Sequence, residues 1–311
     1  MFPPSVSVLV PCRNEIKFIN QIIQNLLEQD YEKEIIEVFF LDGISNDGTR
    51  EIISSYSKKY NFINLVDNIY KTVPYALNIG IKKAKGDVII RLDSHAEYPT
   101  NYISTLVHYL NRLNADNVGA VWNTVPSNDT LKAKSIAIAL SSNFCVGNAT
   151  YRINKKIDSE YIEVDTVPFG CYRREVFDRI GLFDEELTRN QDNEFNERLK
   201  KAGGKIYLIP SLKIKYYARE NYSKLFKMFY QYGYFGPLVD IKLKRPTRLR
   251  RYIPSLFILA LTIPIILSFL YFPFFYLWLF VVCSYILASV SFSTVEAVKS
   301  NNILLIPFII W

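Results

Sequence analysis

The sequence predicts an α/β protein whose main sheet is largely parallel, followed by a pair of apolar helices toward the C-terminus. Short apolar runs rich in β-branched residues alternate with segments of helical spacing from residue 5 to residue 92. This alternation is typical of βαβ units with helices on both faces of a sheet. From Ile253 to Val295 no Asp, Glu, Lys, Arg or His occurs, which is enough chain for two membrane-spanning helices.

The elements are expected in a fixed order along the chain. The first four strands are expected at residues 5–10, 35–41, 62–66 and 88–92, separated by helices at 15–29, from 49 onward and at 73–85. Further strands are expected at 119–125, 166–172 and 205–210, and further helices at 102–113, 173–180, 192–202 and 222–235.

Polar clusters follow three of the expected strands. They are the Pro11-Cys12-Arg13-Asn14-Glu15 stretch, Asp42, and the Asp93-Ser94-His95 stretch. In open α/β sheets, ligands bind beyond the carboxyl ends of the strands. Three clusters at one edge therefore predict a binding site there.

Asp93 and His95 form the first candidate site. Residues two apart on an extended segment point to the same side, so a carboxylate and an imidazole could together hold a divalent cation. The imidazole favours Mn²⁺ or another transition metal over Mg²⁺. The alternative is that Asp93 caps the helix near Pro99 and that His95 is an ordinary loop residue.

Two further carboxylates are candidates for chemistry. Asp42 could accept hydrogen bonds from a ribose or a base, whereas Asp47 and Thr49 are better explained by an Asx turn and a helix start. Asp192 lies in the first turn of an expected helix, where the helix dipole alone favours an acid. A carboxylate held there at the edge of the sheet could also act as a general base.

The C-terminal region predicts a membrane hairpin of helices at 253–271 and 274–292, with Pro264 bending the first helix. Basic residues crowd the chain just before it: Lys242, Lys244, Arg245, Arg248, Arg250 and Arg251. Their position favours a cytosolic membrane flank that meets anionic lipid over a nucleic-acid site. Residues 296–302 would return to the cytosol, and residues 303–311 would form an interfacial segment or the start of a third span.

The four cysteines are scattered and lack metal-ligand spacing, which fits a reducing compartment. The N-terminus has no basic region followed by a long apolar one, so no signal peptide is expected.

Several motifs resemble the inverting family-two glycosyltransferases, which have the nucleotide-sugar-binding, Rossmann-like GT-A fold. The resemblance covers about residues 5–240 and is nearest to the branch that includes succinoglycan-biosynthesis enzymes, whose metal motif also reads Asp-x-His. The motifs are Pro11 with Arg13-Asn14-Glu15, the turn from Asp42 to Thr49, Asn78-Ile79-Gly80, Ala84-Lys85-Gly86-Asp87, Asp93-Ser94-His95, 170–174, 181–185 and 189–192.

The resemblance implies a role for each matching position. Asp93 and His95 would hold Mn²⁺ or Mg²⁺ against the diphosphate of a nucleotide sugar, expected to be a UDP-sugar, and Asp192 would take the proton of the acceptor hydroxyl. The residues expected to contact the nucleotide sugar are Pro11, Arg13, Glu15, Asp42, Asn78, Arg91 and Asp93.

The sequence departs from the family pattern in three places. Gly43 stands where a second acid often follows Asp42, and Gln191 rather than an acid precedes Asp192. The Gln-x-x-Arg-Trp motif of processive synthases has no match near Gln231, which favours transfer of a single sugar.

The expected protein is a membrane-anchored, metal-dependent, inverting glycosyltransferase. Its organisation would be a catalytic domain at 1–240 facing the cytosol, a basic juxtamembrane linker at 241–252 and membrane-associated helices at 253–311. The expected acceptor is a lipid-linked saccharide of surface polysaccharide biosynthesis, and no nucleic acid is expected as a partner. The alternatives are a polyprenyl-phosphate sugar transferase and a non-catalytic nucleotide-sugar-binding subunit of an assembly complex.

Overall fold

The computed structural model describes residues 3–147, 149–152, 158–246 and 252–310. The chain forms two compact units, each built from two separate stretches. The first unit comprises Met1–Asn123 and Ala149–Tyr217, and the second comprises Thr124–Asn148 and Ala218–Trp311. Residues 124–148 and 218–240, which fall within the expected catalytic range of 1–240, belong to the second unit.

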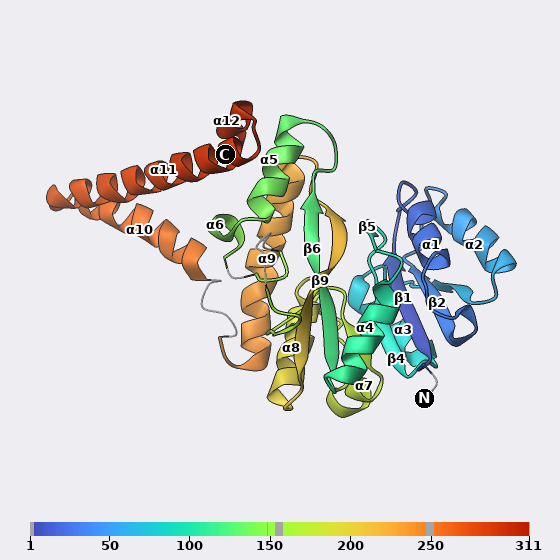
Figure 1. The fold of residues 1–311 in the computed structure, drawn as a ribbon. Coiled ribbons are helices and arrows are strands. Elements are labelled where there is room, and N and C mark those ends of the chain that lie inside the picture. Colours follow the sequence, from blue (N-terminus) through green and yellow to red (C-terminus); the bar gives the residue numbers. More distant parts are fainter. Residues whose placement is uncertain (1–2, 148, 153–157, 247–251, 311) are drawn as a thin grey trace. The chain divides into compact units, whose positions relative to one another are not determined.

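One mixed sheet organises the first unit (Figure 1). Its strand order is β3-β2-β1-β4-β8-β6-β9-β5, with β7 paired to β9. The first four strands run parallel, as expected, and β8 pairs antiparallel with β4 and β6. The strands are β1 (Val6–Cys12), β2 (Ile36–Asp42), β3 (Ile63–Asp67), β4 (Val88–Arg91), β5 (Ala96–Glu97), β6 (Asn117–Val125), β7 (Ile162–Glu163), β8 (Cys171–Arg173) and β9 (Ile206–Tyr217).

Helices connect these strands, and the apolar spacing in the sequence explains them. In the first helix, Ile19, Ile22, Ile23 and Leu26 are all buried, which is the spacing of one helical face. The helices of this unit are α1 (Ile19–Leu27), α2 (Thr49–Lys59), α3 (Val73–Lys83), α4 (Tyr102–Arg112), α7 (Glu175–Ile180) and α8 (Gln191–Lys201), and a 3₁₀ turn, η1 (Lys33–Ile35), precedes β2.

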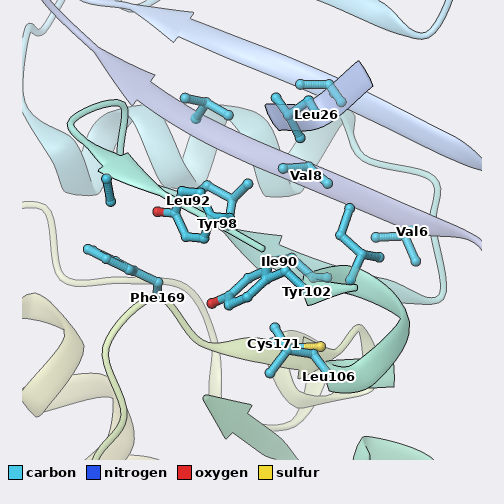
Figure 2. Packing of buried hydrophobic residues seen from close by; sticks show 14 of the residues in the cluster. Val6, Val8, Leu26, Ile90, Leu92, Tyr98, Tyr102, Leu106, Phe169 and Cys171 are labelled. Atoms are coloured by element: carbon cyan, nitrogen blue, oxygen red, sulfur yellow. The ribbon is translucent and has the colours of Figure 1, made fainter. Parts of the chain in front are cut away.

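Alternate residues of β1 point to opposite faces of the sheet, as the two-residue period of a strand requires. Val6 and Val8 pack in one cluster with residues of α1 and α4, whereas Leu9 packs in another with residues of α3 and α8. Figure 2 shows part of the first cluster, in which Val6 and Val8 lie near Ile90 and Tyr102. Both faces are therefore covered, which is why the central strands read as nearly continuous apolar runs.

Two expected strands differ from those observed. Residues 166–170 are irregular, and a strand forms only at β8, because Phe169 has a positive φ of 48° that a strand cannot include. The strand expected to end at Pro210 continues to Tyr217. Beyond the proline, Leu212, Ile214 and Tyr216 are buried at every second position, so the alternating pattern outweighs the loss of one backbone donor.

The second unit is helical. A small apolar cluster that includes Ile136, Leu140 and Met228 joins α5 to α9. The Tyr222 hydroxyl of α9 donates to the Phe308 carbonyl of α12 at 2.7 Å. The helices are α5 (Leu131–Leu140), α6 (Asn143–Val146), α9 (Tyr222–Leu243), α10 (Ile253–Leu267), α11 (Pro273–Lys299) and α12 (Ile306–Ile310), with a 3₁₀ turn, η3 (Ile303–Leu305), before α12.

The apolar region forms two helices, as expected, but their lengths are unequal. The first ends at Leu267, and the second continues to Lys299, beyond the expected residue 292. By length and composition, α11 alone among the described helices could cross a membrane, since α10 is shorter than a span requires. Phe257 of α10 contacts Tyr285 of α11, with ring centroids 4.8 Å apart. Arg248, Arg250 and Arg251 lie outside the described residues.

Candidate functional site

The carboxyl ends of the parallel strands lie side by side. The register aligns Cys12 with Asp42, and Asp42 with Asp67, at the ends of β1, β2 and β3. β4 is aligned with β1 through Leu9 and Arg91, so the residues after Arg91 leave the sheet at the same edge. The predicted clusters therefore share the edge at which open α/β sheets bind ligands.

Asp42 organises the turn that follows β2. It is fully buried, and its carboxylate accepts hydrogen bonds from the backbone N–H of Ser45 at 3.0 Å and from the Ser45 hydroxyl. Arg50 donates to Asp42 at 2.9 Å and to Asp67 at 2.6 Å, which links the ends of β2 and β3. Both oxygens of Asp42 are engaged within the chain, and its predicted contact with a nucleoside stays a prediction.

The loop after β1 is tied to this same turn. The Asn14 backbone N–H donates to the Ser45 hydroxyl at 2.9 Å, and the Asn14 side-chain oxygen accepts from the Asn46 N–H at 3.0 Å. Arg13 is exposed, and its side chain lies over Gly43, where an added Cβ would be 3.0 Å from Arg13 Cδ. The glycine that departs from the family pattern thus leaves room for Arg13 at the edge of the sheet.

Glu15 connects the first loop to the metal motif. Its backbone N–H donates to the Thr49 hydroxyl at 2.9 Å, and its carboxylate lies 3.8 Å from His95 Nδ1. Pro11, within β1, is partly buried two residues before the loop begins. The structure therefore brings Glu15 and His95, which are far apart in the sequence, to one place.

His95 lies among aromatic rings but keeps a path to solvent. Its ring centroid is 6.4 Å from that of Phe18 and 5.9 Å from that of Tyr216, and its side chain is 24 % exposed. The flanking rings restrict the orientation of the imidazole, which is nevertheless partly open to solvent.

Arg91 and Asp93 form an ion pair at the end of β4. The Arg91 guanidinium donates to Asp93 Oδ1 from Nη2 at 2.9 Å and from Nε at 3.2 Å, and it lies over the Phe169 ring. The two side chains are only 12 % and 19 % exposed, so the pair is shielded from water on most sides. This pairing fixes one oxygen of Asp93.

Asp192 belongs to the same electrostatic cluster. Burial opposes the charge of Arg91, but Asp93 and Asp192 outweigh burial and raise the pKa of Arg91. Burial likewise opposes the charge of Asp93, but Arg91, with His95 and Arg189, holds the pKa of Asp93 below its usual value. Asp192 and Arg189 therefore act electrostatically on the end of β4, although about a hundred residues separate them from it in the sequence.

The metal pair of Asp93 and His95 stays a prediction, in which the cation is shared with a bound diphosphate. Among the described residues, no group of three or more His, Cys, Asp or Glu side chains could hold a metal ion. Asp93 and His95 would thus supply one carboxylate and one imidazole, and a ligand's oxygens and water would complete the coordination. Arg91 occupies Asp93 Oδ1, and no described group bonds Oδ2. An oxygen and a nitrogen donor together suit Mn²⁺.

Asp192 and Glu194 lie in the first turn of α8 but have different surroundings. Asp192 is partly exposed, and its carboxylate accepts a hydrogen bond only from the adjacent Asn193 N–H, at 2.9 Å, among the described residues. Glu194 is buried and forms a two-pronged ion pair with Arg198, which also donates to the carbonyls of Ile180 and Leu182. Asp192 is thus the less constrained of the two carboxylates, and Glu194 is held by Arg198.

Asn78 joins α3 to the segment that precedes α8. It is buried, and its amide donates to the Phe183 carbonyl and to Glu185, each at 2.9 Å, while its oxygen accepts from the Phe183 N–H at 3.0 Å. These bonds attach the segment before α8 to α3. The predicted contact of Asn78 with the donor stays a prediction, and its observed contacts are internal.

Sequence reasoning assigned no role to Tyr98, which stabilises the metal motif. The backbone N–H of Asp93 donates to the Tyr98 hydroxyl at 2.8 Å, and that hydroxyl donates to the Asp93 carbonyl at 3.2 Å. The ring is buried against Tyr102 and Phe169 (Figure 2). The closeness of Tyr98 to Asp93 in the sequence was the available signal.

Comparison with known proteins identifies the class that this fold and site define. Residues 7–181, more than half of the chain, match Glycosyl transferase family 2. The chain belongs to this family, and its fold is GT-A, as the sequence motifs predicted.

Two relatives cover most of the chain. The chain is 30% identical over 236 residues to the dolichyl N-acetyl-alpha-D-glucosaminyl phosphate 3-beta-D-2,3-diacetamido-2,3-dideoxy-beta-D-glucuronosyltransferase of Methanococcus voltae, covering 73% of this chain and 71% of the relative. It is 29% identical over 231 residues to the succinoglycan biosynthesis protein ExoA of Rhizobium meliloti, covering 74% and 67%.

Solved structures share the fold at lower identity. The mannosyltransferase PcManGT from Pyrobaculum calidifontis, in complex with GDP-Man and Mn²⁺, aligns with a TM-score of 0.61 at 18% identity, covering 99% of this chain and 83% of that one. TarS 1–349 of S. aureus, in complex with UDP-GlcNAc, aligns with a TM-score of 0.54 at 20% identity, covering 70% of this chain and 59% of that one.

Proposed function

We propose that this protein is a membrane-anchored, inverting glycosyltransferase that moves one sugar from a nucleotide sugar to a lipid-linked saccharide. The observation that carries the proposal is the ion pair of Arg91 with Asp93 at the carboxyl end of β4, with Asp192 near enough to help raise the pKa of Arg91. One carboxylate lies beside His95 in the motif that would face a diphosphate. The other is partly exposed at the start of α8, where an acceptor can reach it.

Asp192 is proposed as the general base. It would accept the proton of the acceptor hydroxyl as that oxygen bonds to the anomeric carbon, while the bond from that carbon to the diphosphate breaks and the nucleoside diphosphate leaves. Attack opposite the leaving group inverts the configuration at that carbon. A positioned base contributes about 10²- to 10⁴-fold in rate.

The donor would lie along the edge formed by the loops after β1, β2 and β4. Pro11, Arg13 and Glu15 are proposed to line the donor site. Asp42 would fix the conformation of the turn after β2 beneath the donor, through its bonds to Ser45 and Arg50. Asp93 and His95 would hold Mn²⁺ or Mg²⁺, which would neutralise charge on the leaving diphosphate. Arg91 keeps Asp93 oriented toward that position.

A lipid-linked acceptor is supported by two features. The Methanococcus voltae relative is named for a dolichyl-linked sugar phosphate. The chain itself carries α11, which is apolar and long enough to cross a membrane. A membrane anchor would keep the enzyme where lipid carriers are, with the catalytic unit on the cytosolic side, and the product would enter surface polysaccharide biosynthesis.

The decisive experiment compares two neighbouring carboxylates and a control. Asp192→Asn should fold normally, bind donor and lose transfer by at least about 10²-fold, because the amide cannot accept the proton. Asp178→Asn, on the exposed side of α7, should retain activity. Membranes would supply the acceptor, and release of nucleoside diphosphate from a panel of nucleotide sugars would be measured. Loss of transfer in Glu194→Gln but not in Asp192→Asn would identify the other carboxylate as the base.

The membrane arrangement has its own test. If α10 and α11 form a hairpin that crosses the bilayer, Pro273→Cys, at the link, should be labelled from outside intact cells. Ser300→Cys, after α11, should then be protected. Strong outside labelling at residue 300 would contradict a hairpin with both ends in the cytosol.

A further inference from the structure

The long helix α9 is apolar on two opposite faces. Its inner face contributes Met228, Leu225 and Tyr232 to the small cluster formed with α5. An apolar face of a helix is normally covered by protein or by lipid. Yet no described part of the chain covers its other face.

The uncovered face is a row of large side chains, which we call the outer α9 stripe: Phe226, Phe229, Tyr230, Tyr234 and Ile241. Phe226, Tyr230, Tyr234 and Ile241 are 74%, 67%, 63% and 71% exposed. Steps of three, four and seven residues place the members on one side of a helix. So many exposed aromatic residues in one row mark an interaction surface rather than scattered surface hydrophobics.

Charges around the stripe are basic. Lys227 is exposed beside it, and Lys224 lies further round the helix, paired with Glu220. Lys242, Lys244 and Arg245 follow at its C-terminal end, and three more arginines occur by residue 251. Aromatic side chains with basic residues at their border suit the headgroup level of an anionic bilayer.

We propose that α9 lies in the interface of an anionic lipid bilayer, with the outer α9 stripe inserted below the headgroups. This rests on the proposed membrane association, because the same compact unit contains α11. The helix would then hold this unit against the membrane at a second place. The stripe's border of lysines and arginines favours lipid over a second copy of this chain, whose identical basic border would repel it.

The test uses the native cysteines of the full chain. Cys12 and Cys171 are buried, whereas Cys145 and Cys283 are exposed. In a Cys145→Ser background, a fluorophore on Cys283 of α11 reports whether that helix enters lipid. In a Cys145→Ser, Cys283→Ser background, single cysteines on α9 report on the stripe.

The α9 labels would replace Phe226 or Tyr230 in the stripe, with Lys224, on another side of the same helix, as the matched control. The protein would be placed in nanodiscs of phosphatidylcholine with or without phosphatidylglycerol, and quenching by aqueous iodide and by lipids spin-labelled near the headgroup would be measured. We expect stripe labels to be several-fold less accessible to iodide than the label at 224 and to be quenched by the lipid. Phosphatidylglycerol should strengthen both effects.

The outcomes separate this inference from the proposed function. Stripe labels as open to iodide as the control, with Cys283 protected, would overturn the inference and leave the α11 anchor intact. Protection that persists in detergent and grows with protein concentration would also overturn it, in favour of a second copy. Nucleoside diphosphate release, measured on the same samples, tests the glycosyltransferase proposal independently.

Discussion

Replacing Asn78 with alanine tests whether its hydrogen bonds to residues 183 and 185 stabilise the first unit. The substitution removes two hydrogen bonds with the Phe183 backbone and one with the Glu185 carboxylate, all at 2.9–3.0 Å. At about 1 kcal/mol for each neutral bond and about 1.5 kcal/mol for the charge-assisted one, the free energy of unfolding should fall by about 3.5 kcal/mol. For a unit of this size, that corresponds to a drop of about 10 °C in melting temperature.

The assay for Asn78→Ala is amide hydrogen exchange of β1 and β2 in detergent, because both strands are paired on each side within the sheet. Donor KM is measured alongside. Asn64→Ala is the control. Within the described residues, the hydrogen bonds of the Asn64 side chain are long, 3.3 and 3.4 Å, and their loss should cost about 1 kcal/mol or less. Unchanged exchange in Asn78→Ala with a raised donor KM would refute the supporting role and favour direct contact with the donor.

Two further predictions concern metal and pH. Transfer should require a divalent cation and prefer Mn²⁺ to Ca²⁺. Asp93→Ala should nearly abolish turnover, and His95→Ala should raise the metal concentration for half-maximal activity by at least about 10-fold. Full activity in excess chelator would contradict the metal requirement. Ser5 donates to Asp87 from its hydroxyl at 2.7 Å and its N–H at 3.1 Å, which lowers the pKa of Asp87. This stabilisation is present above about pH 4 and is lost as pH falls through the pKa of Asp87 in the folded protein. Ser5→Ala should therefore reduce the melting temperature more at pH 7 than at pH 3. An equal reduction at both pH values would contradict the link between the Ser5 bonds and the charge of Asp87.

The sequence by itself determined the parallel half of the sheet. Val6, Val8 and Val10 alternate with residues of the other face, and the apolar runs of β1, β2 and β4 are bounded by turn residues. Such local periodicity depends on neighbours along the chain, so it can be recognised without a structure. The family followed from motifs of the same local kind, and the comparisons confirm it.

Only the tertiary structure shows how the surroundings of neighbouring carboxylates differ. Resemblance to the family assigned the proton-accepting role to Asp192. In the structure, Arg198 pairs with Glu194 one helical turn away, whereas Asp192 is partly exposed. Likewise, the internal bonds of Asn78 could not be foreseen, because its partners lie about a hundred residues away.

The same distinction holds for the second unit. A charge-free run predicted apolar helices, whereas the end of α10 at Leu267 and the exposed side of α9 became evident only in the folded chain. Hydrophobicity is a property of each residue and is visible in the sequence. Exposure is a property of how distant segments pack, because the same phenylalanine is core when another helix covers it and an interaction surface when none does.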